Sequence, residues 1–459
     1  MQSDARKTAL QILIKIQARR LPLDLVIEDF QTTINAMDPK DRRLMNAIVY
    51  GVLRWRSRLD RVIAESSRTP LHKIEPKIRD ILRIAIFQLI YLDRVPESAA
   101  IHTAVDLTKF ISSTRGAPGF VNGVLRNVQK VWRDVYDPPA HTPLVQRLAW
   151  KQAIPEWMLE RWCARFGEEK TEALAQSVNR IPAMTLRVNR LRTDQKKVLE
   201  LLTDKVRDIQ PNPWVEDAID FSHPDGAIDR LPGFRDGFFQ IQDAAAQLVT
   251  LMLAPRSGER VLDACAGYGG KTGHMAQLMQ NKGEILASDL SAAKLMRLSH
   301  EMQRLGITLV KTQAADLTHE QSSLNLGRFD RILLDAPCSG MGVIRRNPDI
   351  KWNREPGGFG HFSQRQARLL HTLSLLLKPG GLMVYAVCST EPEETTELID
   401  QFLAAHPEMQ REVPGARFPD QARSLITEKG EFMPWKESFE LDGFFAVALR
   451  KTGRRKVIV

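Results

Sequence analysis

The chain has 459 residues, 43% of them hydrophobic and 26% charged, which is typical of a globular protein with two or three packed domains. No stretch approaches about eighteen consecutive apolar residues, and the start alternates charged with apolar residues, so the sequence excludes a membrane span and a signal peptide and predicts a cytoplasmic protein. The formal net charge is +10, and a basic chain of this kind favours a polyanion as partner.

Residues 1 to about 135 show helical periodicity, for example in KIEPKIRDILRIAIFQLIYL, where apolar side chains gather on one face. This pattern predicts an all-helical bundle of about five to seven helices. Residues 1–140 carry 23 Lys and Arg against 15 Asp and Glu, which is +8 of the total charge of +10. A basic domain beside a near-neutral one suggests that the first binds a polyanion on which the second acts, although a solvated basic face explains the charge equally well.

The prolines of YDPPAHTP (136–143) break the helical pattern and predict a domain boundary near residue 140. The pattern is then mixed, because PEWMLERWCARFGEEKTEALAQSVN is helical and AMTLRVNR alternates like a strand. We predict a small α+β connector over residues 141–237.

From residue 238 onward, strands alternate with helices: RVLDACA, EILASDL, LVKTQAAD, FDRILLDAP and GLMVYAVCST are the expected strands. This alternation predicts a doubly wound, Rossmann-like α/β domain with a parallel sheet over residues 238–459. Ligands of such sheets bind beyond the carboxyl ends of the strands, which is where the distinctive residues of this chain lie.

The stretch VLDACAGYGGKTGHMAQLM (261–279) predicts a strand, a glycine-rich turn and a helix. A phosphate-binding loop needs glycine where Cys265 stands, and a dinucleotide fingerprint needs glycine where Thr272 stands. Both of these interpretations therefore lose ground to S-adenosylmethionine, whose amino-acid end must approach the backbone of such a turn.

Acidic residues end the next two strands. Asp289 is placed to accept from the ribose hydroxyls of this cofactor, and Asp316 from its adenine amino group. Asp often caps a following helix instead. Two such residues behind a glycine turn favour the nucleoside ligand.

The four cysteines form no C-x-x-C pair, so we predict neither a disulfide framework nor a metal site. Cys163, in a helix, and Cys265, beside the turn, fit structural roles. DAPCSGMGVIRRNPDIKW (335–352) and YAVCSTEPEE (385–394) each place a cysteine after a strand, at the functional edge of the sheet. Lys351 and Arg345 near the first thiol, and a helix amino terminus near the second, are the neighbours expected to tune a thiolate.

A thiol at this edge suits methyl transfer to carbon rather than to oxygen or nitrogen. Carbon 5 of a pyrimidine becomes a nucleophile only after a thiolate adds to carbon 6. A second group must then help to remove the proton on carbon 5 and expel the thiolate. Asp335 is placed to hydrogen bond to the ring nitrogen or protonate it as charge builds there.

Several stretches resemble one known family. DACAGYGGKT, DAPCSGMGVIRRNPDIKW, VCST and DGFFAVALRK (442–451) resemble the Sun/NOL1/NOP2 family of RNA cytosine carbon-5 methyltransferases. RDILRIAIFQLIYLDRVPESAAIHTAVDLTKF and GFVNGVLRN resemble the NusB RNA-binding fold. The combination implies methylation of carbon 5 of a cytosine in 16S ribosomal RNA, free of the ribosome or early in its assembly, by a monomer that uses S-adenosylmethionine.

The resemblance also implies roles for individual residues. Cys388 is the nucleophile that attacks carbon 6, Cys338 assists product release, and Asp335 and Lys271 complete the catalytic set. The cofactor contacts that it implies are Cys265, Ala266, Gly267, Tyr268, Gly269, Gly270, Lys271, Asp289, Lys294, Asp316 and Asp335. Two departures leave the reacting groups in place: Tyr268 stands where the family has proline, and Val387 where it often has threonine.

Basic and aromatic residues predict the RNA contacts. Arg42, Arg43, Arg54 and Arg56 flank Trp55, a set suited to phosphates and a stacked base, although helical spacing fits Trp55 better as a core residue. LRVN (186–189) resembles the RNA-contacting segment of the family and predicts contacts from Arg187 and Asn189. A cytosine must leave its stack to reach a thiol, and the residues expected to line its pocket are Arg345, Asn347, Pro348 and Asp349.

Three alternatives stay open. In DNA cytosine methyltransferases the cysteine after proline is the nucleophile, which would give that role to Cys338. A catalytically inactive NusB-like RNA-binding factor in ribosome assembly is the alternative from another class, and the intact thiols and strand-end acids argue against it. Carbon-5 methylation of another RNA is the third. Adenine amino-group methylation is disfavoured, because no N-P-P-Y or D-P-P-Y segment follows the fourth strand.

Overall fold

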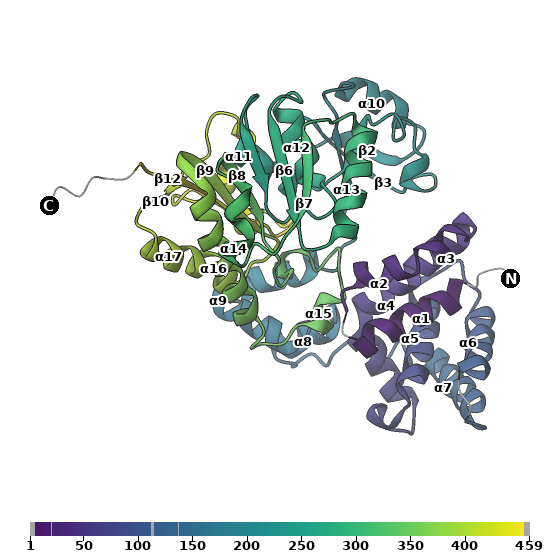
Figure 1. The fold of residues 1–459 in the computed structure, drawn as a ribbon. Coiled ribbons are helices and arrows are strands. Elements are labelled where there is room, and N and C mark those ends of the chain that lie inside the picture. The colour runs from purple at the N-terminus through teal and green to yellow at the C-terminus, as the bar shows by residue number, and fades with distance from the viewer. Residues whose placement is uncertain (1–4, 20, 112–113, 136, 454–459) are drawn as a thin grey trace. The chain divides into compact units, whose positions relative to one another are not determined.

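The computed structural model describes residues 5–19, 21–111, 114–135 and 137–453, except for the side chains of 322–324. The outer ends of the first and last predicted domains, and Tyr136 at the predicted boundary, lie outside these residues. The chain divides into two compact units, and each is described by itself. The first reaches Ile181 and includes Ile344–Pro356, and the second holds Pro182–Val343 and the chain from Gly357 onward (Figure 1).

The first unit is helical, as predicted. Its elements are α1 (Ala5–Arg19), α2 (Leu23–Asp29), α3 (Gln31–Asn35), α4 (Pro39–Ser66), η1 (Leu71–Lys73), α5 (Pro76–Tyr91), α6 (Glu97–Ile111), α7 (Ala117–Val131), α8 (Leu144–Gln152), α9 (Glu156–Ser177) and α15 (Ile350–Asn353). The seven α-helices described before residue 135 confirm the predicted bundle. The apolar face of α5, with Ile81, Leu82 and Ala85 fully buried, lies in its core.

Close packing of α4 against α5 depends on Gly51, since a Cβ atom there would lie 2.0 Å from the ring of Phe87. Trp55 is the one residue of α4 with non-helical backbone angles, and its ring stacks on Tyr91 with centroids 5.4 Å apart. Both aromatic rings pack against the hydrophobic core. Trp55 therefore occupies the core position that its helical spacing favours.

Helices α8 and α9 belong to the first unit, although residues 141–181 were predicted as part of the connector. The physical reason is that α8 packs on α4 of the bundle and α9 packs on α8. The Arg58 guanidinium donates to the carbonyl of Lys151 (3.1 Å), and the Asn179 amide donates to the carbonyl of Gln152 (2.5 Å). Leu148 and Trp162 are buried.

The segment Ile344–Pro356 belongs to the same helical unit, although the first part of its sequence motif, Asp335 to Val343, belongs to the second unit. The Lys351 ammonium donates to the carbonyl of Arg54 (2.6 Å), and the Trp352 indole donates to the carbonyl of Leu53 (2.6 Å). The carboxylate of Asp349 accepts from the backbone N–H of Leu23 (3.1 Å). The segment is therefore bonded to the kinked middle of α4 and to the start of α2.

The second unit begins with a small antiparallel sheet in the order β2-β3-β1-β4. Its elements are β1 (Met184–Val188), α10 (Gln195–Leu202), β2 (Arg207–Pro211), β3 (Ala218–Ser222), η2 (Ile228–Arg230) and β4 (Phe239–Ile241). Leu186, Phe221 and Phe239 are fully buried in its own core. This sheet with its helix confirms the predicted α+β connector, and β1 is the strand expected from AMTLRVNR.

The large domain has a sheet in the order β10-β12-β9-β8-β5-β6-β7, with β11 paired to β12 (Figure 1). Its elements are α11 (Ala244–Leu253), β5 (Arg260–Asp263), α12 (Gly270–Leu278), β6 (Glu284–Asp289), α13 (Ala292–Leu305), β7 (Val310–Ala314), α14 (Glu320–Ser323), η3 (Leu324–Leu326), β8 (Phe329–Asp335), η4 (Met341–Val343), α16 (Phe359–Leu376), β9 (Leu377–Val387), η5 (Pro392–Glu394), α17 (Thr396–Ala405), β10 (Met409–Glu412), η6 (Asp420–Leu425), β11 (Glu431–Phe432), η7 (Pro434–Lys436) and β12 (Phe445–Lys451). Strands β5 to β9 are parallel, and β10, β11 and β12 add an antiparallel edge. The predicted Rossmann-like fold is confirmed.

Parallel pairing brings the carboxyl ends of the central strands to one edge of this sheet. Strand β5 ends at Asp263, β6 at Asp289 and β8 at Asp335, and Asp335 pairs with Ala386 two residues before Cys388. The candidate site lies along this edge. Within the described ranges, none of the helices combines the length and the hydropathy that a bilayer span requires.

Candidate active site

The glycine turn after β5 has the backbone conformation that its sequence requires. Gly267 has a φ of 54° and Gly269 a φ of 85°, both in the left-handed region that favours glycine. A Cβ atom at Gly269 would lie 2.7 Å from the side chain of Leu298, whereas one at Gly270 would meet nothing within 4 Å. The turn is therefore packed on one side and open at Gly270.

Asp289 is bonded to this turn rather than to a helix end. Its carboxylate accepts from the N–H of Gly267 (3.0 Å) and from the N–H of Ser291 (2.9 Å). The N-cap of α13 is Ser291, whose hydroxyl accepts from the N–H of Lys294 (3.3 Å). Asp289 thus does not cap the helix, and it holds the turn against the end of β6.

Asp316, after β7, accepts from the backbone N–H and the hydroxyl of Thr318 at 2.9 and 2.6 Å. These bonds lower the pKa of Asp316 and keep its half-exposed carboxylate ionised. Tyr268 is 39% exposed, and the cations of Lys294 and Arg297 lie 5.5 and 5.7 Å from its ring centroid. Contacts of these side chains with the cofactor stay predictions.

Lys271 and Asp335 form an ion pair at the strand edge, with 2.5 Å between the Nζ and Oδ2 atoms. Burial by itself would lower the pKa of Lys271, but the charge and hydrogen bond of Asp335 outweigh it and raise that pKa. The negative charges of Asp263 and Cys388 act in the same direction. The ammonium therefore stays protonated within electrostatic reach of the Cys388 sulfur.

Asp263 is a residue that the sequence analysis missed. It is 1% exposed, and the Thr272 hydroxyl donates to its Oδ2 atom (2.6 Å). Burial raises the pKa of Asp263 to about 7. Its Oδ1 atom is buried and has no hydrogen-bond partner among the described residues. The available signal was its position as the last residue of the strand before the glycine turn.

The thiols of Cys338 and Cys388 face each other, with 3.3 Å between their Sγ atoms. The hydrogen bond to Cys388, burial and the charge of Cys388 raise the pKa of Cys338 well above its ordinary value. Cys338 therefore keeps its proton, and either sulfur of the pair can donate the hydrogen bond between them. Burial likewise raises the pKa of Cys265, which makes it an inert thiol beside the turn.

The two thiol loops are joined through their backbones. The N–H of Gly342 donates to the carbonyl of Cys388 (3.0 Å), and the N–H of Gly443 donates to the carbonyl of Gly342 (2.8 Å). A Cβ atom at Gly342 would lie 1.7 Å from the carbonyl oxygen of Gly443. The glycine of the closing DGFF stretch is thus a packing partner of the first cysteine loop.

The prediction that Lys351 tunes the Cys338 thiol is wrong, whereas the prediction for Arg345 stays a prediction. The groups that shift the pKa of Cys338 are Cys388, burial, Glu394 and the Gly340 backbone, and they include no basic side chain. Lys351 donates instead to the Arg54 carbonyl and to the Asn179 amide oxygen, in the helical unit. A short 3-10 turn, η5, comes between Cys388 and helix α17.

Arg187 and Asn189, predicted as RNA contacts, are 1% and 3% exposed, so that prediction is wrong for this structure. The Arg187 guanidinium donates to Gln240 (2.8 Å), to Gln242 and to the carbonyl of Gly270 (2.8 Å). The Asn189 amide donates to the carbonyls of Gly237 (2.8 Å) and Leu305 (2.9 Å). Their role is to brace the cofactor turn and the end of α13 against β1.

The other predicted RNA residues lie in the helical unit. Arg54 is 6% exposed and donates to the carbonyl of Arg345 (2.6 Å), so its guanidinium is bonded to the segment Ile344–Pro356. Arg42 donates to the carbonyls of Asn35 and Met37 (3.3 and 3.5 Å). Arg43 is exposed, and Arg345 and Asn347 are partly exposed. RNA contact by Arg42, Arg43, Arg345 and Asn347 stays a prediction.

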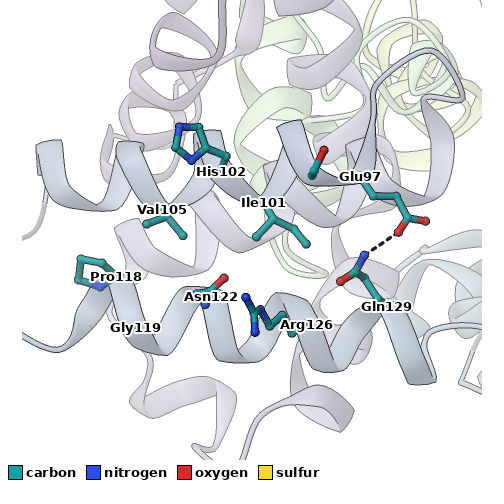
Figure 2. A pocket seen from close by; sticks show the side chains of 10 residues that line it. Glu97, Ile101, His102, Val105, Pro118, Gly119, Asn122, Arg126 and Gln129 are labelled. Carbon is teal, nitrogen blue, oxygen red and sulfur yellow. Dashed lines mark hydrogen bonds between the residues drawn. The ribbon is translucent and has the colours of Figure 1, made fainter.

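A groove of about 760 Å³ runs between α6 and α7 of the helical unit (Figure 2). Ile101 and Val105 face into it from α6, and Asn122 and Arg126 from α7. The Gln129 amide donates to Glu97 (2.6 Å) across one end. None of the thiols or strand-end acids lines this groove, so it is not the reaction site.

S-adenosylmethionine fits the residues at the strand edge. It carries an ammonium and a sulfonium, and the buried Oδ1 atom of Asp263, for which the described residues provide no donor, is an acceptor suited to such cations. The open side of the turn at Gly270 leaves space for its amino-acid end. Asp289, at the end of β6, and Asp316, after β7, stay the predicted acceptors for its nucleoside. Within the described chain, no group of three or more His, Cys, Asp or Glu side chains is arranged to hold a metal.

Three family models match the chain. One described as 16S rRNA methyltransferase RsmB/F matches residues 250–450, and the NusB family model matches residues 3–130. A third, described as the ferredoxin-like domain of RsmF/B-like methyltransferases, matches residues 154–227.

Curated relatives match the whole length. Probable ribosomal RNA small subunit methyltransferase B of Bacillus subtilis is 33% identical over 98% of this chain and 99% of its own. The chain belongs to the RsmB/F family of 16S rRNA methyltransferases. Ribosomal RNA small subunit methyltransferase B of Salmonella typhi is 34% identical over 94% of this chain and 96% of its own. Members of the family are S-adenosylmethionine-dependent methyltransferases, so the predicted family and cofactor are confirmed.

Solved structures support the same fold. The protein in the structure named Crystal Structure of PH0851 is 26% identical and covers 98% of this chain and 99% of its own, with a TM-score of 0.80. A methyltransferase homologue from Pyrococcus horikoshii is 28% identical over 68% of this chain and 99% of its own, with a TM-score of 0.57. The RsmB/F methyltransferase assignment therefore agrees with the observed order of the helical domain, the small sheet and the Rossmann-like domain.

Proposed function

We propose that this RsmB/F-family enzyme methylates carbon 5 of a cytosine in 16S ribosomal RNA, with Cys388 as the covalent nucleophile and Cys338 as the residue that assists release. The observation that carries the proposal is the thiol pair, with sulfur atoms 3.3 Å apart, at the strand edge that also holds the Lys271–Asp335 ion pair. Transfer to nitrogen or oxygen requires no such pair of thiols.

In the first step, the Cys388 thiolate forms a bond to carbon 6 of the cytosine, and the electrons of the 5,6 double bond move into the ring. We place the negative charge of the pair on Cys388, because the pKa of Cys338 is raised well above its ordinary value and Cys338 keeps its proton. The Lys271 ammonium stabilises that charge, since the charge of Cys388 raises the pKa of Lys271 in return.

In the second step, carbon 5 of the adduct takes the methyl group. When bound, S-adenosylmethionine supplies this group on a positively charged sulfur. The Lys271 ammonium, held by the carboxylate of Asp335, hydrogen bonds to the polar edge of the ring, which carries the negative charge of the adduct until the methyl transfer removes it. Because the pKa of Lys271 is raised, the ammonium remains a donor throughout.

In the third step, the proton on carbon 5 leaves, the double bond forms again and the Cys388 thiolate is expelled. Cys338 takes that proton after it has lost its own. The charge of Cys388 contributes to the raised pKa of Cys338, and this contribution disappears while Cys388 is bonded to carbon 6, so Cys338 then loses its proton to water. The Cys338 thiolate is the base that takes the proton from carbon 5, and the reaction releases one proton overall.

The proposed substrate is 16S ribosomal RNA free of the ribosome or early in its assembly, bound by a monomer in the cytoplasm. The relatives named as small-subunit methyltransferases support the choice of RNA. The basic amino-terminal region, residues 1–140, with the exposed Arg43, supports binding of a polyanion there.

The first test compares cysteine variants on denaturing gels of enzyme with 16S RNA. We expect Cys388→Ala to form no covalent adduct and Cys338→Ala to accumulate one, because only the second keeps the nucleophile. Cys163→Ala, in α9, is the control that forms and releases the adduct as the wild type does. The opposite pattern, with adduct lost in Cys338→Ala alone, assigns the nucleophile to Cys338 and overturns the roles.

The second test is bisulfite sequencing of ribosomal RNA from cells with and without the gene. A single lost mark in 16S RNA is expected. A mark lost only in another RNA overturns the substrate, and no lost mark together with failure to bind S-adenosylmethionine by calorimetry favours the inactive assembly factor.

A further inference from the structure

A buried carboxylate lies beneath the two thiol loops. Glu394 is fully buried, in η5. Its Oε1 atom accepts from the backbone N–H of Ser339 (2.8 Å), and its Oε2 atom accepts from the hydroxyls of Ser339 (2.5 Å) and Ser389 (2.6 Å). Ser339 directly follows Cys338, and Ser389 directly follows Cys388. One carboxylate thus binds the residue next to each thiol.

The two serine hydroxyls require an acceptor at this position. Their Oγ atoms are 3.1 Å apart, but each lies closer to the Oε2 atom of Glu394. Each hydroxyl has one hydrogen, and both serines are fully buried. Donors also face the Oε1 atom, from the Ser339 backbone and the Gln366 amide. A carboxylate accepts at both oxygens at once, whereas an amide of the same shape turns its NH2 group toward one of these two sets of donors.

Glu394 is itself held on two further sides. The Gln366 amide of α16 donates to its Oε1 atom (3.1 Å) and to the carbonyl of Pro337 (2.9 Å). The hydroxyl of Tyr385, at the end of β9, donates to the backbone carbonyl of Glu394 (2.7 Å). Gln366 and Tyr385 are fully buried. The carboxylate is therefore fixed to the sheet and to a helix, which makes it a rigid reference for both loops.

We propose that Glu394 is a positioning residue that sets the separation and orientation of Cys338 and Cys388 by binding Ser339 and Ser389. The effect of Glu394 on catalysis rests on the proposed function. Its effect on the geometry of the thiol pair does not depend on that function. A carboxylate that served only folding would affect the stability of the protein without changing the relative reactivity of the two sulfurs.

The test compares Glu394→Gln with Glu397→Gln. The control residue is exposed, in the first turn of α17, so it gives the same change of charge three residues away. Each variant is first checked by its thermal melting and by calorimetry with S-adenosylmethionine. Alkylation by iodoacetamide is then followed at each cysteine by mass spectrometry across a pH series, and covalent adduct formation with 16S RNA is timed.

In the wild type and in Glu397→Gln we expect Cys388 to react before Cys338. In Glu394→Gln we expect the ratio of the two alkylation rates to fall about tenfold, because the charge of Glu394 also contributes to the raised pKa of Cys338. The rate of adduct formation should fall about 100-fold, since a small misplacement of reacting groups has an effect of that size. Affinity for S-adenosylmethionine should stay within about twofold of wild type.

An unchanged alkylation ratio in a folded Glu394→Gln variant overturns the positioning role. If this variant does not fold, Ser389→Ala decides by the same measurements, because it removes one of the two hydroxyl contacts and leaves the carboxylate. If the wild type forms no adduct with RNA but the alkylation ratio still changes in Glu394→Gln, then the proposed function fails and the positioning role stands.

Discussion

Two lysines, one in each unit, have pKa values that are shifted in opposite directions by their surroundings. Lys271, in the Rossmann-like domain, pairs with the carboxylate of Asp335, and its pKa is raised. Lys351, in the helical unit, is 1% exposed and donates to neutral oxygens of Arg54 and Asn179, and burial lowers its pKa well below the ordinary value. A charge partner is what separates the cation proposed to act in catalysis, Lys271, from the structural amine of Lys351.

The comparison also divides the motif DAPCSGMGVIRRNPDIKW into two parts with different roles. Its first part, to Val343, holds Asp335 and Cys338 at the strand edge. Its second part, from Ile344, is docked on α2 and α4 of the helical unit. A continuous sequence motif is therefore divided between the two units, and membership of the motif does not tell which residues lie at the strand edge.

Lys271→Met tests the catalytic side and should have the largest effect. We expect methylation and adduct formation to fall about 100-fold to 1000-fold, because the variant loses the preorganised cation beside Cys388 and the base. Single-turnover methylation of 16S RNA measures this change, with the exposed Lys282→Met as the control that keeps full activity. A rate within about twofold of wild type, with affinity for the cofactor retained, would assign no catalytic role to this cation.

Asp263→Asn tests the same site through stability. Below about pH 4 the Asp263 carboxyl is protonated in the folded and the unfolded chain. Between about pH 4 and its folded pKa of about 7, only the folded chain keeps the proton. The free energy of unfolding of the wild type should therefore fall as pH rises through this window, by up to about 4 kcal/mol.

Asp263→Asn has no carboxyl to ionise, so its free energy of unfolding should lack this decrease. Urea denaturation at a series of pH values, without cofactor, measures both proteins. Parallel curves for the two proteins would contradict the raised pKa of Asp263. A difference confined to pH values above 7 would contradict it as well.

Much of the fold is predictable because the relevant signals are local. The helical periodicity of apolar residues predicted the bundle, and the alternation of apolar and polar residues predicted β1. Apolar runs that end in Asp predicted β6 and β8. The glycine turn follows from φ angles that only glycine adopts easily at Gly267 and Gly269. These features depend on neighbours a few residues apart.

The parts that the sequence did not predict depend on contacts between distant residues. Alternation in LRVN places Arg187 and Asn189 on one face of a strand, but it does not tell that α12 and α13 cover that face. Ser339 and Glu394 are separated by 55 positions, and no spacing rule relates them. A basic residue near a cysteine in sequence, such as Lys351, can belong to another unit.

Lys351→Met tests the structural side and should have the smallest effect. Burial lowers the pKa of Lys351, so the unfolded chain binds its proton at pH values where the folded chain does not. The free energy of unfolding of the wild type should thus rise with pH toward about 10.5, by at most about 1.4 kcal/mol per pH unit, and Lys351→Met should lack this rise. Lys77→Met, an exposed lysine of α5, is the control and should follow the wild type. Thiol alkylation and cofactor affinity should not change in Lys351→Met, because the Lys351 ammonium is bonded within the helical unit. A change in the alkylation of Cys338 would show that Lys351 acts on this thiol, and it would contradict the distinction between the two lysines.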